Sequence, residues 1–214
     1  MVELHAIARP SLAASGLGPA SGSLDPGLLH FALEPQAGVA DRLEAGAYFE
    51  TSVWPDGSVR VEGGKLRLKW HFAPDSWPVD MAVNVEVGRS DPLSGEPVWA
   101  GELRPILWKR LGRCRAGLNP IVGFGFQPLG VPTFEPAAKL DCEVVWNLAP
   151  GLEYYGDWGP LTGLWPLAQQ QHFLFYTLDV YRWPKVEVNV GAGEPLTRAS
   201  GPWILNANLG WQFP

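Results

Sequence analysis

Long hydrophobic runs are missing from this sequence of 214 residues. No stretch approaches the roughly eighteen consecutive apolar residues that a membrane-spanning helix needs, so helical membrane spanning is excluded. Disorder is excluded as well, because 46% of the residues are hydrophobic. The length suits either one soluble all-β domain or a barrel of about a dozen short strands.

Motifs that carry chemistry are also scarce. The chain has two cysteines and no CxxC pair, and it contains neither a glycine-rich phosphate loop nor a Ser-His-Asp order. We therefore expect no enzyme and no cofactor. An esterase or phospholipase built on a barrel is the alternative, and it rests on fold analogy alone.

Positive charge is in deficit, with 16 Lys and Arg against 22 Asp and Glu and a formal net charge of -6. This balance argues against nucleic acid as a partner. The opening residues Met1-Val2-Glu3-Leu4-His5 have neither a basic start nor an apolar core, so no secretory signal is visible. We expect a mature chain that begins at its first strand.

Glycine, proline and tryptophan are abundant instead, at 25, 21 and 11 residues. Glycine and proline suit a chain that turns often. Tryptophan favours places where one side is apolar and the other is wet. This composition indicates a β-protein with many turns and with aromatic rings at an interface.

The stretch from Trp203 to Phe213 shows the organising pattern. Its odd positions are all apolar, whereas Asn206, Asn208, Gly210 and Gln212 are polar or lack a side chain. Because side chains on a strand alternate between faces, one face is apolar and the other is polar. Aromatics at both ends of the apolar face are typical of a lipid-facing strand in a transmembrane β-barrel. An amphipathic strand of a soluble sandwich is the alternative.

The same alternation recurs along the chain and predicts about twelve strands, an even number of the kind that single-chain bacterial barrels have. In the fourth strand the apolar phase shifts between Val61 and Leu66, and Gly63-Gly64 predicts a bulge there. The predicted strands lie near 2–12, 29–39, 43–50, 59–72, 79–87, 99–107, 114–124, 134–144, 152–157, 174–181, 186–192 and 203–213.

Prolines interrupt four of these strands, all at positions that the alternation assigns to the outer face. A proline removes a hydrogen bond from the ladder, and a closed barrel has no sheet edge to accommodate it. We therefore expect local bulges at these residues, which are Pro35, Pro105, Pro120 and Pro136.

The connections and the tryptophans favour the membrane over a soluble sandwich. Long connections, near 14–27, 88–97, 158–171 and 194–202, alternate with short ones near 39–41, 110–113 and 182–185. This order is expected when one end of a barrel faces the outside and the other faces the periplasm. Most tryptophans lie at or near strand ends, as aromatic girdles require. The predicted fold is all-β, a single antiparallel transmembrane β-barrel domain spanning residues 1–214.

Several motifs resemble a known group of proteins. They are the run 151–160, Gln169-Gln170-Gln171-His172, the strand 186–193, the segments 102–106, 119–121 and 134–137, and a terminal Leu-Gly-aromatic-x-Phe. Together they are similar to small outer-membrane barrels of proteobacteria that are labelled as transporters, some of them linked with aromatic-compound degradation. The resemblance runs from about Leu29 to the C-terminus, and it implies a barrel in the bacterial outer membrane. Pro214 after Phe213 departs from the usual ending.

Function, on this interpretation, belongs to the polar interior, where carboxylates and basic residues are interspersed. The alternation predicts that the lumen is lined by Glu34, Glu44, Arg67, Lys69, Glu86, Glu102, Arg104, Glu135, Lys139, Asp141, Glu153, Tyr155, Asp157, Glu187 and Asn206. One hypothesis is a passive channel whose electronegative lining favours cations or polar solutes. The other is a non-conducting structural or interaction barrel whose charges pair across the lumen and fill it.

More specific expectations follow for ion pairs, metals and partners. Arg67 and Arg104 are expected to pair with inward carboxylates such as Glu86, Glu102 or Glu135. His5, His30 and His71 share the inward face, but no metal-ligand spacing accompanies them, so we expect no metal site. The expected partners are outer-membrane lipid and small solutes, and the sequence does not indicate an oligomeric state.

The two cysteines provide a test of strand pairing. Cys114 opens the strand after the short turn at Gly112, and Cys142 lies near the end of the next strand, both at outward positions. Antiparallel pairing brings them to the same end and face of neighbouring strands. A disulfide and two separate thiols are both compatible with this placement, because bonding depends on the exact register.

Overall fold

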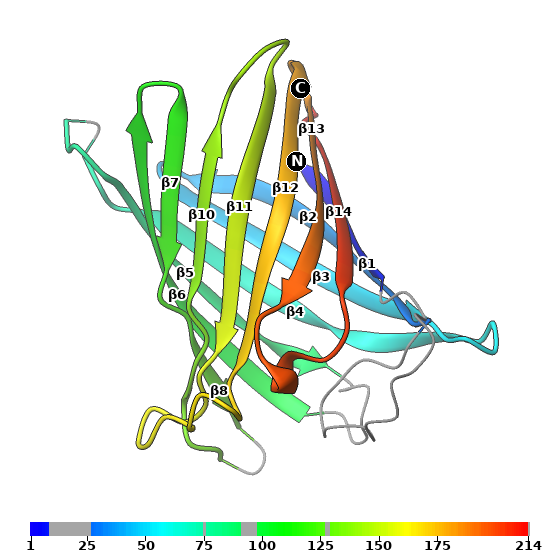
Figure 1. The fold of residues 1–214 in the computed structure, drawn as a ribbon. Helices are drawn as coiled ribbons and strands as arrows, with labels where there is room; N and C mark the ends of the chain where they lie inside the picture. Colours follow the sequence, from blue (N-terminus) through cyan, green and yellow to red (C-terminus); the bar gives the residue numbers. More distant parts are fainter. Residues whose placement is uncertain (9–26, 75, 91–97, 127–128, 214) are drawn as a thin grey trace.

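The computed structural model describes residues 1–8, 27–74, 76–90, 98–126 and 129–213 (Figure 1). The predicted end of the first strand, nearly all of the loop at 14–27, most of the loop at 88–97 and Pro214 lie outside these ranges. No helix in the described ranges is long and apolar enough to cross a membrane.

The strands belong to one antiparallel sheet, and the only helix in these ranges is the short 3-10 helix η1 (Arg198–Ser200). The strands are β1 (Val2–Ala8), β2 (Leu29–Ala40), β3 (Leu43–Val53), β4 (Val59–His71), β5 (Asp80–Ser90), β6 (Val98–Leu111), β7 (Cys114–Asn119), β8 (Val122–Gly125), β9 (Thr133–Phe134), β10 (Ala137–Cys142), β11 (Leu148–Asp157), β12 (Gln171–Trp183), β13 (Val186–Pro195) and β14 (Ile204–Trp211).

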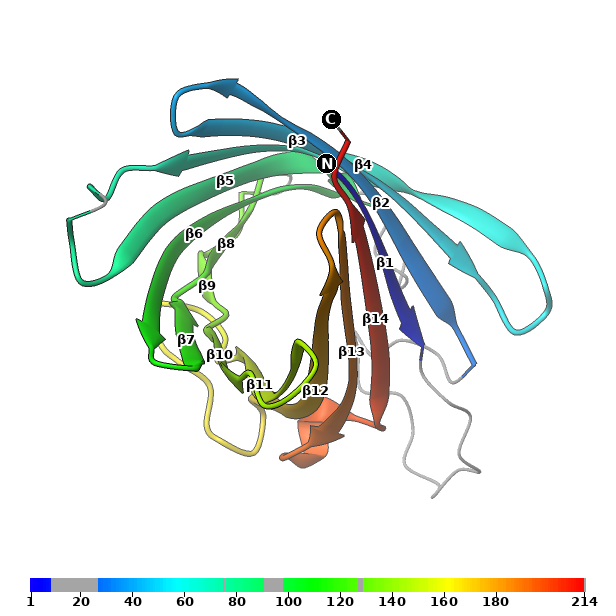
Figure 2. The same ribbon diagram turned by 90° about the horizontal axis from the view of Figure 1, so that it is seen from above.

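The sheet closes into a barrel of 12 strands, as expected from the sequence. β1 pairs with both β2 and β14, so the first and last strands form the closing seam. β7 and β8 together make one wall strand, because both pair with β6 in a single register, and β9 and β10 make the next in the same way. Figure 2 shows the strands arranged as a ring.

The expectation of bulges at the four prolines is wrong. Leu107 pairs with Leu118 and Leu103 pairs with Val122, so β6 keeps its register past Pro105 and Pro120, which face one another. The register of β8, β9 and β10 likewise places Pro136 opposite Pro120. Because proline has no N–H, three adjacent strands lack ladder hydrogen bonds at the same level. The strands contain no extra residue there, so they form no bulge.

Pro35 behaves similarly, since β2 and β3 pair in one register on both sides of it. The predicted bulge at Gly63-Gly64 is confirmed. Glu50 pairs with Gly63 whereas Thr51 pairs with Val61, so Glu62 is the extra residue. The shift restores the alternation, which lets Glu62 and Lys65 share the polar face of β4.

The two ends of the barrel differ, and we call them the turn end and the loop end. The turn end has the tight connections 41–42, 112–113 and 184–185, together with both termini (Figure 1). The loop end has longer connections, among them 158–170 and 196–203. The tryptophans gather near both ends: Trp70, Trp77, Trp146, Trp183 and Trp211 at the turn end, and Trp54, Trp99, Trp158, Trp165 and Trp203 at the loop end.

Candidate functional site

The wall of the barrel has an inverted distribution of polar and apolar side chains. Asp141 is 1% exposed and Glu34, Glu86 and Glu153 are also buried, whereas Val61 is 78% exposed. A soluble protein buries apolar side chains and rarely buries unpaired carboxylates. The described part of the chain instead presents a broad apolar outer surface and keeps its polar side chains on the inner face of the barrel.

A cavity of about 520 Å³, the central cavity, lies inside the barrel. Alternate residues of β6 face it, and so do alternate residues of β10 and β11, because side chains two apart on a strand share a face. The charged and aromatic residues in its wall are Glu102, Arg104, Trp108, Glu135, Lys139, Glu153 and Tyr155.

Two smaller cavities lie on either side of it along β6. The loop-side cavity, about 280 Å³, is lined by Ala100 and Glu102, and the turn-side cavity, about 270 Å³, is lined by Arg110. Between these two cavities, Glu102 and Trp108 of β6 line the central cavity. Ten strand residues separate Ala100 from Arg110, or roughly 33 Å at about 3.3 Å per residue. The three cavities therefore follow one another along the inner face of β6.

Most charges around the central cavity are paired. Lys139 Nζ lies 2.7 Å from Glu153 Oε1 and 2.8 Å from Asp179 Oδ2, so it bridges β11 and β12. Arg104 Nε lies 2.7 Å from Glu102 Oε1 on the same strand. Opposite charges at these distances cancel most of each other's field inside the cavity.

Glu135 is the exception among these carboxylates. It lines both the central and the loop-side cavity, and Thr133 Oγ1 donates a hydrogen bond of 2.7 Å to its Oε1. It has no ion-pair partner within the described ranges, and the cations of the central cavity, Arg104 and Lys139, contact other carboxylates. Among the carboxylates that line the central cavity, its negative charge is therefore the least compensated.

A denser network covers the inner face of β2, β3 and β4. Arg67 Nη1 lies 2.8 Å from Glu34 Oε1, and Arg67 Nη2 lies 3.7 Å from Glu44 Oε2. Lys69 Nζ contacts the same Glu44 oxygen at 3.0 Å. These side chains fill the interior beside β2–β4, whereas the central cavity lies beside β6, β10 and β11.

The expectation that both arginines pair with inward carboxylates is confirmed, but of the three carboxylates named for them only Glu102 is a partner, and it pairs with Arg104. Glu86 lies directly across the β4–β5 ladder from Arg67, but it accepts hydrogen bonds from Asn84 Nδ2 at 2.9 Å and Tyr48 Oη at 3.4 Å. Arg67 reaches over β3 to Glu34 on β2 instead. A long guanidinium side chain can span two strands, so the facing residue is not its only available partner.

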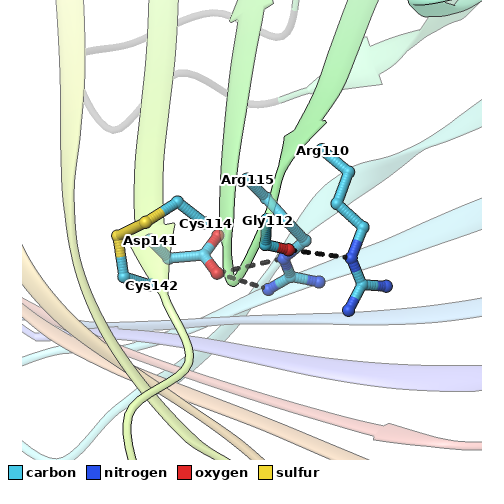
Figure 3. Close-up of a disulfide and its surroundings, with 6 residues drawn as sticks. All are labelled: Arg110, Gly112, Cys114, Arg115, Asp141 and Cys142. Atoms are coloured by element: carbon cyan, nitrogen blue, oxygen red, sulfur yellow. Dashed lines mark hydrogen bonds and ion pairs between the residues drawn. A yellow bond between two sulfur atoms is a disulfide. The ribbon is translucent and has the colours of Figure 1, made fainter.

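The turn-side cavity is rich in arginine. Arg115 Nη2 lies 2.8 Å from the buried Asp141 Oδ1, and its guanidinium lies over the Tyr181 ring at 4.5 Å from the centroid. Cys114 and Cys142, the residues next to this pair on the same two strands, form a disulfide (Figure 3). The strand pairing expected from the cysteines is therefore confirmed, with the bonded alternative.

The residues predicted to line the lumen fall into separate groups. The central cavity brings together Glu102, Arg104, Glu135, Lys139, Glu153 and Tyr155; Glu86 lines the loop-side cavity and Asp141 the turn-side cavity. Glu34, Glu44, Arg67 and Lys69 belong to the ion-pair network. Asp157, Glu187 and Asn206 line none of these three cavities. Contact of any of them with a solute stays a prediction.

Sequence reasoning missed Trp108, which lines the central cavity near the turn end. Two signals were available for it. Trp108 has the same strand parity as Glu102 and Arg104, and Gly117 faces it directly on β7. A Cβ on Gly117 would lie 2.8 Å from the Trp108 ring, so the glycine makes room for the indole.

One group of side chains could hold a metal ion, within the ranges that the structure describes. Ligand atoms of Glu3, His5 and Glu34 lie within 4.8 Å of one another on the inner face of β1 and β2. No spacing in the sequence indicates this group, because the β1–β2 register brings Glu34 beside Glu3 and His5.

No family model matches the chain, and no curated protein matches it. Solved structures do resemble it. The KdgM porin matches over 100% of this chain and 99% of its own, with a TM-score of 0.63 and 11% identity. LpxR from Salmonella typhimurium matches over 100% of both chains, with a TM-score of 0.51 and 9% identity. At these identities the similarity is one of fold, and the chain has a porin-like closed β-barrel fold.

Proposed function

We propose that the protein is a passive channel for small solutes in the bacterial outer membrane. The observation that carries the proposal is the series of three cavities along the inner face of β6. Their course of roughly 33 Å follows a strand tilted by about 35–45°, so it rises about 23–27 Å along the barrel axis, comparable with the apolar band of about 25 Å that a channel must cross. The porin-like fold supports the same function.

The outer surface supports the location. Apolar side chains such as Leu66, Leu103 and Leu205 are exposed on the outer face, and tryptophans lie near both ends of the barrel. Lipid is the partner that such a surface fits, because the aromatic rings then lie at the two membrane interfaces. The turn end, with its tight connections, would face the periplasm.

The charges of the interior support a preference for cations and polar solutes. Paired charges contribute little net field, so the selectivity depends most on Glu135, which lines two adjoining cavities without an ion-pair partner. Arg110 and Arg113 at the turn end are exposed, and water and salt screen their charge more strongly.

Planar-bilayer recording under a salt gradient tests this proposal. The purified barrel is expected to give a steady unitary current with a reversal potential on the cation-selective side. Glu135→Gln removes one unpaired negative charge, so it should move the reversal potential towards zero. Asp56→Asn, in the exposed turn after β3, is the matched control and should leave it unchanged. A silent wild-type barrel would contradict the proposal.

One alternative function has an observation of its own. Lys139 links Glu153 and Asp179 across the inner face, and the Arg67 network fills the space beside β2–β4. If such ion pairs closed the remaining path, the barrel would be non-conducting and would serve as a structural or interaction protein. Absence of current from correctly folded protein would favour this alternative.

Three further expectations belong to this proposal. The sequence motifs at 102–106, 119–121, 134–137 and 151–160 support an origin in proteobacteria and a place among small outer-membrane transporters. A link with aromatic-compound degradation stays a prediction. We also expect no enzymatic activity, and the fold similarity to a porin supports this expectation.

A further inference from the structure

The closing seam of the barrel carries an arrangement that ion pairing explains only in part. Glu3 lies directly opposite Glu34 in the β1–β2 ladder, and both side chains are on the inner face. Like charges that face one another across a ladder are destabilising. His5, two residues after Glu3 on β1, shares their face and lies opposite Asn208 on β14.

The distances within this group match those of metal ligands. His5 Nε2 lies 3.3 Å from Glu3 Oε2 and 3.3 Å from Glu34 Oε2. Two ligands bound to zinc at about 2.0–2.1 Å with a tetrahedral angle are about 3.3 Å apart. All three candidate ligand atoms lie within 4.8 Å of one another, so one ion can reach each of them.

Each of the three side chains is also oriented by a second polar neighbour. His5 Nδ1 can donate its hydrogen to Asn208 Oδ1 at 2.9 Å, and this contact directs Nε2 towards the two carboxylates, where it lies 3.3 Å from Glu34 Oε2. Gln36 Nε2 donates to Glu3 Oε1 at 2.6 Å, and Arg67 Nη1 contacts Glu34 Oε1 at 2.8 Å. Metal ligands are held in this way in proteins, with the outer atom of each ligand hydrogen-bonded to a neighbour.

The other histidines of the inner face provide a comparison. His30 Nδ1 lies 2.7 Å from Glu62 Oε2, and His71 Nε2 lies 3.1 Å from Glu44 Oε1. Neither belongs to a group of three ligand-bearing side chains within the described ranges. They show the ordinary histidine–carboxylate pair of this barrel, and the group at Glu3, His5 and Glu34 differs from it by its second carboxylate.

We propose that Glu3, His5 and Glu34 bind one divalent transition-metal ion, with zinc the best fit to one imidazole and two carboxylates. The ion would join β1 to β2 and, through the His5–Asn208 hydrogen bond, would orient β14 as well. It would therefore strengthen the seam where the first and last strands meet. It would also neutralise the two facing carboxylates.

Isothermal titration of the full chain, folded in detergent and stripped with a chelator, tests the site with zinc chloride as the probe. Wild-type protein is expected to bind one equivalent and to unfold at a higher temperature with zinc than without it, since binding stabilises the folded state. Asn208→Ala should weaken binding by about 10- to 100-fold, as loss of an outer hydrogen bond does elsewhere.

Variants of the ligands separate this site from adventitious binding. His5→Gln and Glu34→Gln should abolish the one-equivalent binding, whereas His30→Gln, the matched control, should retain it. Heat-modifiable mobility confirms that each variant is folded. Absence of saturable zinc binding by wild-type protein would overturn the proposal, whatever the variants do. Binding that both ligand variants retain would overturn it as well.

Discussion

At the scale of single residues, two arginines on the same face have different surroundings. The Arg67 side chain is 10% exposed and contacts a buried carboxylate, whereas the Arg104 side chain is 32% exposed. Arg67→Ala removes the guanidinium that contacts the buried Glu34 and leaves His5 as its remaining basic neighbour, so it should cost up to about 3 kcal/mol of unfolding free energy. Arg104→Ala breaks a pair that water reaches more readily than the Arg67 contact, so it should cost less, about 1 kcal/mol.

Urea unfolding of the barrel in lipid vesicles, followed by tryptophan fluorescence, measures both values. Lys185→Ala, in the tight turn between β12 and β13, is an exposed control and should have no effect. Equal and small losses for Arg67→Ala and Arg104→Ala would mean that water reaches Glu34 freely. The interior beside β2–β4 would then be open.

The sequence predicted the face of each of these residues but not its contacts. Face follows from local alternation, so Glu34, Arg67 and Arg104 could be assigned together. The contact between Arg67 and Glu34 depends on the registers of two successive ladders, which no local pattern specifies. The group Glu3, His5 and Glu34 escaped notice for the same reason.

At the scale of the strand, β14 tests the assignment of outer and inner faces. Leu205 is exposed on the outer face, and Asn206, the next residue, lies on the inner face. Leu205→Asp places a carboxylate in the apolar band and should cost about 2 kcal/mol or more, so insertion should fail. Val188→Asp, on β13 opposite Leu209, should behave in the same way.

The yield of heat-modifiable, folded barrel measures this effect, and Asn206→Asp is the matched control. It introduces the same carboxylate one residue further on, where the polar interior accommodates it. Normal yields from both outward variants would show that the apolar face does not contact lipid.

The pair β7 and β10 carries the disulfide between Cys114 and Cys142, which closes a sequence separation of 28 residues. Denatured, non-reduced protein should show no thiol that reacts with a maleimide, and two after reduction. Replacing both cysteines by serine should lower the unfolding free energy by at most about 3 to 4 kcal/mol, the loop-entropy value for such a separation.

The single variant Cys114→Ser provides the control for this labelling. It should expose one reactive thiol, at Cys142, without any reductant. Labelling of two thiols in untreated wild-type protein would show that the bond is absent.

Strand interruptions were the least predictable elements. The Gly63-Gly64 bulge was predictable because a shift in apolar phase reveals an extra residue. The prolines produce no such shift, since Pro105, Pro120 and Pro136 remain in register. Their alignment at one level depends on ladder registers, so the sequence could show each proline but not their arrangement.

At the scale of the whole molecule, a closed barrel of about 12 strands was predictable because the same alternation of apolar and polar residues recurs along the chain. The division of the interior into a filled side and a side with cavities was not predictable. Ion pairs fill the side beside β2–β4, and cavities follow β6, because side-chain lengths and strand tilt together decide which residues meet. One cross-strand contact takes part in this division: Trp108 on β6 lies opposite Gly117 on β7.

Solutes are proposed to pass through the cavities along β6, and thiol modification of Glu135→Cys in a planar bilayer is the sharpest test of this passage. Both native cysteines are in the disulfide, so the new thiol is the only reactive one. We expect a steady unitary current that drops in one step when a bulky cationic methanethiosulfonate reaches residue 135, with no such drop in the wild type. A barrel without current, or a current that this modification leaves unchanged, would contradict it.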